Sequence, residues 1–578
     1  MVKSGVRIAG NANRSEYYNQ PLAVQLSNKS WIVVLTNADH TEGQPNQRVA
    51  SRLHVSPNLT EGSWLPEVDI EHQPYGPSAG WAAPLYAPEL ERLYAFYTFN
   101  EGNITTMPGS NETCACQLVG GQWYRWSDDF GATWSAERMR VPIRVTSIDR
   151  ENPWKGSVLQ GWTVSKPIAV DGAVLMPYTK IGTYVQSHER QWVLRSDNVL
   201  TERDARKIRW TTWPDGDGGC GAADGSDEAE EGGLLDLGGG VVLFIFRSSG
   251  GRVNECVSRD GGRTWAPRLV YYAPIAADEA PRPLKNPRGP LTARKLADGS
   301  FLLLYFNNGW KGYSPHNDTR NPYFLSLGRS DGDRILWSQP EVALYGRGVV
   351  DGHNPTYDLA YPDVVEETPG GRVVIFEAHE GYPGSNCNDP AFEAIGGCGV
   401  ATHVVDARLL AGLRGQNDSS AVATEGLALD AGPGVAKAPR LPVLDEAPGG
   451  VTVEAWLQGD GVVLDCRRGD VGVRLRRRGA VVSFDVNGAS FDYAAGADAR
   501  HVAVVVDGGP RLATWVVDGH FGDGGEDAVL GYAFFDALGD ANGAATCAVG
   551  AAARRVRVYG RYLRTSELVA NHRAGPEA

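Results

Sequence analysis

Residues 258–265 read SRDGGRTW and residues 127–134 read SDDFGATW, so both stretches share the pattern Ser-x-Asp-x-Gly-x-Thr-Trp. Asp and Gly favour a tight turn, the Asp carboxylate can cap N–H groups of the turn, and the Trp side chain can pack beneath it. Residues 330–337, SDGDRILW, form a degraded third copy, and residues 56–64 are a candidate fourth. The repeat therefore predicts a series of hairpins that are stapled by the same turn.

Short apolar runs recur along the first 400 residues, and most of them follow turn-forming residues. They are WIVVL at 31–35, LYAFY at 93–97, VVLFIF at 241–246, FLLLYF at 301–306 and VVIF at 373–376. Runs of this length predict strands, and no helical periodicity of comparable length appears before residue 400. The 71 glycines and 34 prolines among 578 residues also favour many turns between short strands.

The composition changes between residues 407 and 450, where Ala, Gly and Pro are frequent and aromatic residues are scarce. New strand-like runs begin at Val451: VTVEAWL at 451–457, HVAVVVD at 501–507 and RVRVYGRYL at 555–563. A shift of this kind indicates a linker, or a strand that wraps between two domains.

The repeated turns resemble the Asp-boxes of the sialidase superfamily, whose fold is a six-bladed β-propeller and in which the boxes are structural. The C-terminal runs resemble a concanavalin-like (laminin-G-like) jelly roll, which opens with an Ala-Trp strand and closes with Tyr-x-Arg-x-Leu, here residues 559–563. The resemblance implies an all-β chain with a sialidase-like six-bladed β-propeller over 1–410, a linker or wrapping segment over 411–450 and a β-sandwich over 451–578.

The resemblance also implies site residues, each at a fixed place relative to the repeat. In sialidases a Glu precedes an Arg by about sixteen residues and an Asp-box follows, as Glu231 and Arg247 do here. A Tyr opens a later blade about sixteen residues before an acidic residue, as Tyr361 and Glu377 do. Arg320 precedes the degraded box, in the place of another arginine of the family.

The chemistry of these residue types is consistent with one reaction. A phenol with a pKa near 10 is a poor nucleophile, so Tyr361 needs a base, and Glu231 is the expected one. Sialidases use a Tyr nucleophile because a carboxylate would be repelled by the carboxylate on the anomeric carbon of the sugar. Arg247 and Arg320 are expected to bind that carboxylate, since a guanidinium group binds it with two hydrogen bonds.

Four further residues complete the expected site. The family's general acid is an Asp on a first-blade loop, so Asp39 is the first choice here and Glu42 the second. Arg288, in an Asn-Pro-Arg sequence before a strand, is a further substrate-binding candidate, and Glu377 is expected to orient an arginine.

One member of the family's arginine clamp is missing. The family's first-blade Arg aligns with residues 19–21, which read NQP. Arg7, Arg14 and Arg48 are the arginines nearest to this position, and any of them, or none, could substitute for it. The expected substrate is therefore an acidic terminal sugar of a glycan, sialic acid among others.

Three functions remain open from the sequence. The first is a retaining exo-glycosidase, of the exo-α-sialidase type, that releases this sugar. The second is a uronic-acid polysaccharide lyase, in which Tyr361 and either His353 or His379 abstract the C5 proton. The third is a carbohydrate-binding protein without turnover. No cofactor or metal is expected, because Cys114 and Cys116 are too closely spaced for a zinc site.

The charge and the cysteines bear on partners and location. The formal net charge of −14 disfavours nucleic-acid binding, and no apolar run reaches the length of a bilayer span. Eight cysteines and seven Asn-x-Ser/Thr sequons favour a secreted or cell-surface glycoprotein with disulfides, although the first residues lack a signal-peptide pattern. Cys387 and Cys398 bracket a short loop, and Cys466 and Cys547 are the two cysteines of the last third.

Overall fold

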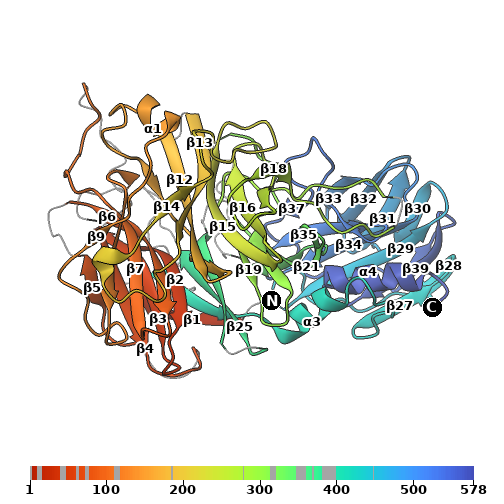
Figure 1. Cartoon of the computed structure of the whole chain (residues 1–578). Coiled ribbons are helices and arrows are strands. Elements are labelled where there is room, and N and C mark those ends of the chain that lie inside the picture. Colours follow the sequence, from red (N-terminus) through yellow and green to blue (C-terminus); the bar gives the residue numbers. More distant parts are fainter. Residues whose placement is uncertain are drawn as a thin grey trace.

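The computed structural model shows an all-β chain in two parts, an N-terminal ring of small sheets and a C-terminal pair of larger sheets (Figure 1). This confirms the predicted fold class, a β-propeller followed by a β-sandwich. The described residues are 3–9, 16–39, 47–59, 64–71, 77–109, 118–183, 187–276, 279–312, 320–345, 359–367, 370–379, 399–446 and 448–578.

Each propeller blade is an antiparallel sheet whose strands follow one another in the chain. Blade 1 holds β2 (Glu16–Gln25), β3 (Trp31–Asp39), β4 (Arg48–His54) and β5 (Val68–Glu71), and blade 2 holds β6 (Ala79–Ala87), β7 (Arg92–Phe99), β8 (Gln122–Ser127) and β9 (Met139–Arg140). Blade 3 holds β10 (Gly161–Trp162), β11 (Ile168–Val170), β12 (Ala173–Thr183), β13 (Ser187–Ser196) and β14 (Thr211–Trp213). The short helix α1 (Ser147–Glu151) precedes blade 3.

The last three blades repeat this arrangement. Blade 4 holds β15 (Ala229–Gly238), β16 (Val241–Ser248), β17 (Asn254–Ser258) and β18 (Ala266–Leu269). Blade 5 holds β19 (Thr292–Lys295), β20 (Phe301–Tyr305), β21 (Tyr323–Asp331), β22 (Arg334–Trp337) and β23 (Glu341–Leu344). Blade 6 holds β24 (Leu359–Glu366), β25 (Val373–His379), β26 (Gly399–Val404) and β1 (Lys3–Ala9).

The ring closes through its innermost strands and through the N-terminal strand. β2 contacts both β6 and β24, β19 contacts both β24 and β15, and β15 contacts β11 of blade 3, so the inner strands of the blades meet around one axis. The N-terminal β1 pairs with β26, which completes the last blade with the start of the chain. The apolar runs at 241–246 and 301–306 are almost entirely buried between blades.

The two complete Asp-boxes have the same geometry. Ser127 Oγ and Ser258 Oγ each accept from the N–H of a glycine four residues on, at 2.8 Å in both boxes. Asp260 accepts from Thr264 N at 2.9 Å and Thr264 Oγ1 at 2.6 Å, and Asp129 makes the equivalent contacts with Thr133. Both boxes join the third and fourth strands of a blade, so the predicted hairpin staple is confirmed. The degraded copy is the β21–β22 hairpin of blade 5.

The C-terminal part consists of two antiparallel sheets. One holds β27 (Leu427–Ala431), β39 (Ala553–Tyr559), β29 (Gly450–Leu457), β34 (His501–Asp507), β35 (Leu512–Val517), β36 (His520–Phe521) and β37 (Ala533–Phe534). The other holds β28 (Gly434–Lys437), β38 (Thr546–Val549), β30 (Gly461–Asp465), β31 (Val473–Arg478), β32 (Val481–Val486) and β33 (Ala489–Ala494). Their apolar faces form one buried core.

The segment between the two parts is structured. Helix α3 (Ala407–Gly415) contacts both β21 of the propeller and the C-terminal helix α4 (Thr565–Ala574). β27 and β28 lie inside the range 411–450 and pair with β39 and β38 of the sandwich. The range predicted as a linker or wrapping segment thus contributes a strand to each sandwich sheet.

Two disulfides lie in the described residues. Cys466 is bonded to Cys547 in the sandwich. Cys220, which lies between β14 and β15, is bonded to Cys256 in β17, and the sequence did not suggest this second pair. Cys387 and Cys398 lie outside the described residues, as do the other two cysteines, at positions 114 and 116. Within the described part of the chain, no helix has both the length and the apolar character that crossing a membrane requires.

We expect Asp260→Ala to lower the free energy of unfolding by about 1–3 kcal/mol, because the turn N–H groups and hydroxyls lose their acceptor. Asp129→Ala should have a similar effect, since its box makes the same contacts. Urea unfolding followed by tryptophan fluorescence measures both. Wild-type stability in both variants would show that the boxes do not staple the blades.

Candidate active site

The inner strands of blades 4 and 6 each carry a β-bulge at a predicted site residue. The register of β15 on β16 shifts between Glu230 and Gly233, and that of β24 on β25 shifts between Ala360 and Asp363. The bulged residues Glu231 and Tyr361 have φ of 53° and 35°. Large side chains rarely adopt such values, and bulges redirect side chains. Both side chains are therefore turned out of the regular alternation of their strands.

Two more blades carry the same bulge. In β2 the register shifts after Asn19 and Gln20 has φ 50°, and in β6 it shifts after Gly80 and Trp81 has φ 60°. Four blades therefore present one redirected side chain each at corresponding positions of the inner strand.

The bulges bring Tyr361 and Glu231 together across the ring. Tyr361 Oη donates a hydrogen bond to Glu231 Oε1 at 2.8 Å, although 130 residues separate them. Glu231 is 2% exposed, whereas Tyr361 is only half-buried. The phenol and the carboxylate that the sequence predicted to meet therefore do meet, and Tyr361 keeps part of its surface exposed.

Glu231 has three further neighbours. Arg247 Nη1 lies 2.6 Å from Oε2, Trp162 Nε1 donates to Oε1 at 3.2 Å, and the Glu231 N–H donates to Thr179 Oγ1 at 3.0 Å. Burial, together with the neighbouring Glu230 carboxylate, raises the pKa of Glu231 to about 7, although the charge of Arg247 opposes the rise. A carboxylate with this pKa is suited to accept a proton near neutral pH.

Glu230, the neighbour of Glu231 in β15, has the opposite character. It is fully buried, with Arg247 Nη2 at 3.1 Å from Oε1 and Arg288 Nε in contact with the same oxygen. Burial alone would raise the pKa of Glu230, but Arg247 and Arg288 outweigh it and hold that pKa below its usual value. The pKa of one glutamate is therefore lowered while that of the adjacent glutamate is raised.

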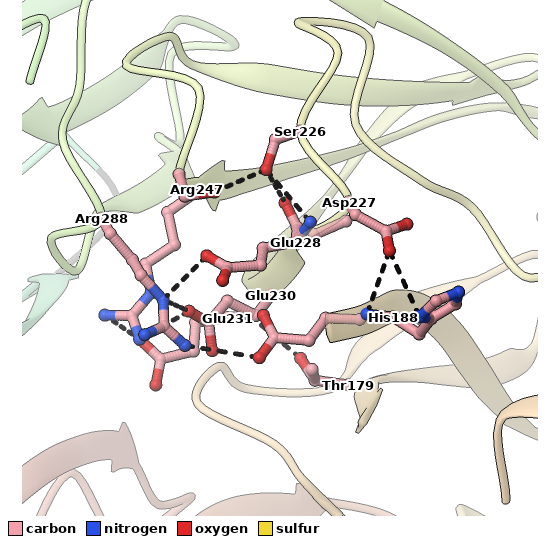
Figure 2. A network of polar contacts seen from close by, with 12 residues as sticks. Thr179, His188, Ser226, Asp227, Glu228, Glu230, Glu231, Arg247 and Arg288 are labelled. Atoms are coloured by element: carbon pink, nitrogen blue, oxygen red, sulfur yellow. Dashed lines mark hydrogen bonds and ion pairs between the residues drawn. The ribbon is translucent and has the colours of Figure 1, made fainter. Parts of the chain in front are cut away.

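Arg288 lies at the centre of a group of acidic side chains (Figure 2). It is 2% exposed, and besides Glu230 it contacts Glu189 at 3.3 Å and Glu228 at 3.4 Å. Burial raises the pKa of Glu189 well above its usual value, and the Glu230 charge adds to this. These three glutamates form the one group in the described residues with metal-ligand spacing, but the Arg288 guanidinium already supplies the positive charge there.

Arg320 lies at the same wall of the site. It is 7% exposed, and its Nη2 donates to the main-chain oxygen of Arg288 at 3.3 Å. Its charge also lowers the pKa of Glu231, so it is close to the carboxylate. The structure therefore brings Glu231, Arg247, Arg288 and Arg320 to one region beside Tyr361.

Two tryptophans form the aromatic side of the site. The Trp81 ring meets the Tyr361 ring edge-on at 5.2 Å between centroids, and Trp162 lies 5.8 Å from Trp81. Trp81 Nε1 is buried with no hydrogen-bond partner among the described residues, and the same holds for both amide atoms of Gln20.

The remaining predicted residues are less well placed or lie outside the description. Glu377 on β25 is fully buried, and its Oε2 lies 3.4 Å from His403 Nε2. Arg48 pairs with Asp69 at the outer strand of blade 1 rather than at the axis. The side chains outside the described residues are those of Asp39, Glu42, Arg7, Arg14, His353 and His379.

Sequence reasoning missed Glu230, Glu189 and Trp81. Glu230 sits in a run of acidic residues, which ordinarily indicates a solvated loop. Its partner Arg288 is 58 residues away and Glu189 is 99 residues from Arg288, so no local spacing connects them. Trp81 has a signal only through its bulge, which the sequence does not reveal.

Comparisons with known proteins agree with the fold. A family model described as "BNR repeat-like domain" matches residues 32–375. Similar solved structures include a Dyadobacter fermentans protein of unknown function (15% identity, 70% of this chain and 98% of that one, TM-score 0.49). They also include a Hadza microbial sialidase (15% identity, 70% of this chain and 68% of that one, TM-score 0.46). Trypanosoma rangeli sialidase is a third (12% identity, 99% of this chain and 96% of that one, TM-score 0.41). Such distant similarity says nothing of what this chain binds. No curated protein matches it.

We expect Arg288→Met to lower the free energy of unfolding by about 3–5 kcal/mol at pH 8, because buried glutamates lose their counter-charge. The loss should be smaller at pH 5.5, where protonation removes part of the uncompensated charge. Thermal unfolding at both pH values measures it. Lys295→Met is the control, since the Lys295 ammonium group donates to a main-chain oxygen at the surface and otherwise lies over the Phe301 ring. An equal loss at both pH values would contradict the charge argument.

Proposed function

The chain belongs to the BNR repeat-like family, and on that premise we propose that it is a retaining glycoside hydrolase with Tyr361 as nucleophile. The observation that carries the proposal is the 2.8 Å hydrogen bond from Tyr361 Oη to Glu231 Oε1, made by two bulged residues of different blades. A phenol hydrogen-bonded to a buried carboxylate with a pKa of about 7 is a nucleophile beside its base.

The reaction then proceeds in two steps. Glu231 accepts the phenolic proton while the Tyr361 oxygen attacks the anomeric carbon, and the glycosidic bond breaks as its oxygen is protonated by a general acid. Water, deprotonated by the conjugate base of that acid, then cleaves the glycosyl–tyrosine bond, and Glu231 returns the proton to the phenolate. Asp39 is the first choice for the general acid and Glu42 the second.

The substrate class follows from the charges beside the nucleophile. Arg247 and Arg320 both act on Glu231, so both guanidinium groups lie within electrostatic reach of a sugar held at Tyr361. An anionic substituent next to the anomeric carbon would be stabilised there, and a neutral phenol would not repel it. The proposed substrate is therefore a glycan with a terminal acidic sugar, such as sialic acid.

The hydrolase is favoured over the lyase because the base that contacts Tyr361 is Glu231. A lyase would pair Tyr361 with a histidine, and the two candidates, His353 and His379, have side chains outside the described residues. The non-catalytic alternative differs from the hydrolase only in turnover, so an assay distinguishes them.

We expect the protein to release the aglycone from fluorogenic sialosides, and Tyr361→Phe to reduce kcat/KM at least about a thousandfold. Tyr86→Phe is the matched control, since Tyr86 Oη only contacts Ser27 Oγ at an exposed turn. Uronic-acid polymers are assayed in parallel for ultraviolet absorbance. An unsaturated product would instead indicate the lyase, and silence in both assays the binding protein.

We expect kcat/KM to rise with pH through an apparent pKa near 7, because Glu231 must be ionised to accept the phenolic proton. Arg247→Met should move this acidic limb upward by roughly one pH unit or more, since the Arg247 charge lowers the pKa of Glu231. Arg268→Met is the control, because it removes the arginine from another buried pair of blade 4, with Glu255. A limb that stays in place in Arg247→Met would exclude Glu231 as the base.

A further inference from the structure

The β-sandwich reaches the propeller close to the site, through the loop between β36 and β37. Lys285 is a propeller residue that is 2% exposed, and its ammonium group donates to three main-chain oxygens of this loop. The acceptors are Asp523 at 2.6 Å, Gly525 at 2.5 Å and Ala528 at 2.7 Å. We call these three oxygens the carbonyl cradle. An ammonium group has three N–H donors, so the cradle satisfies all of them.

The loop is shaped for this contact. Gly524 and Gly525 both have positive φ, 80° and 84°, a conformation that glycine adopts at little cost and that lets successive carbonyls turn to one side. A Cβ at Gly309, beneath the loop, would lie 3.2 Å from Lys285 Cδ and 3.3 Å from Ala528 O. The contact is therefore closely packed on both sides.

Neighbouring hydrogen bonds hold the same loop. Arg252 Nη2 donates to Glu526 O at 2.9 Å, and Gly309 N donates to Val529 O at 2.8 Å. Arg252 and Lys285 face each other in an isolated β-bridge. The docking of this loop thus depends on main-chain acceptors and on cationic side chains of the propeller.

Lys285 is joined to the site by a rigid turn. The next residue, Asn286, is fully buried, and its side chain accepts from Phe306 N at 2.9 Å and donates to Pro287 O and Gly289 O at 2.8 and 3.0 Å. These bonds fix the turn 286–289 as one body. Any displacement of Lys285 is therefore passed to Arg288, which lies three residues further on.

Arg288 connects the turn to the reacting groups in two ways. Its guanidinium group compensates Glu230, whose charge acts on Glu231, and its main-chain oxygen accepts from Arg320. A shift of the turn would weaken both contacts at once.

We propose that the sandwich helps to position the side chains of the active site. Its carbonyl cradle holds Lys285, and the turn 286–289 then positions Arg288 and Arg320 beside Glu231. Lys285 is a positioning residue and touches no substrate. The proposal rests on the proposed function for its kinetic readout, but not for its structural one.

The test compares Lys285→Met, which keeps the length of the side chain but removes the ammonium group, with Lys295→Met as control, at the end of β19. In Lys285→Met we expect faster amide hydrogen exchange at 286–289 and a kcat/KM that is about ten- to a hundredfold lower. We also expect the acidic limb of the kcat/KM pH profile to shift upward by about half a pH unit or more. The limb rises because a less compensated Glu230 raises the pKa of Glu231. A contact of merely structural importance would leave the limb in place in the folded variant.

Gly525→Ala disturbs the cradle from the sandwich side, since alanine is strained at φ 84° while nothing lies within 4 Å of the added methyl group. It should shift the limb in the same direction, and it keeps the test decisive if Lys285→Met does not fold. A folded Gly525→Ala or Lys285→Met with wild-type exchange at 286–289 and a wild-type limb would overturn the proposal. If the wild type shows no turnover, the proposed function fails. The hydrogen exchange at 286–289 then decides alone whether the carbonyl cradle holds the turn through Lys285.

Discussion

The site depends on one contact, the hydrogen bond between the phenol of Tyr361 and the carboxylate of Glu231. Neither side chain could reach the other from a regular strand, because each has left the strand register through a bulge with positive φ. Such a conformation costs about 1–3 kcal/mol for each residue, and the packed blades on either side must supply it. The rigidity of the ring is therefore what holds together two side chains that are 130 positions apart.

The electrostatics of the site follow from a division of charge between two neighbours in β15. Glu230 is ionised because Arg247 and Arg288 surround it, and its charge in turn adds to the burial that raises the pKa of Glu231 to about 7. Arg247 contacts both carboxylates, so it prevents the second pKa from rising further. A base that works near neutral pH is thus obtained from a carboxylate by placing a permanently ionised one beside it.

The sequence predicted the fold and the meeting of Tyr361 with Glu231 because both have local signals: the Asp-box, the apolar runs, and the spacing of sixteen residues. It missed the partners of that pair, since the contacts of Arg288 with Glu189 and Glu230 connect different blades and leave no periodicity in the chain. Glu230 was hidden in an acidic run that resembles an exposed loop. The bulges were also invisible, because the residues that carry them are neither glycine nor asparagine, the types that ordinarily mark positive φ.

The spacing between a bulged residue and the residue that faces it belongs to the hairpin and not to catalysis. In β24 the bulged pair beginning at Tyr361 faces Glu377, sixteen residues on. In β15 the bulged pair beginning at Glu231 faces Phe246, fifteen residues on. The bulge therefore decides which residue leaves the strand register, and the spacing follows the length of the hairpin. Gln20 in β2 is bulged in the same way, so it occupies the position in blade 1 that Glu231 and Tyr361 occupy in blades 4 and 6.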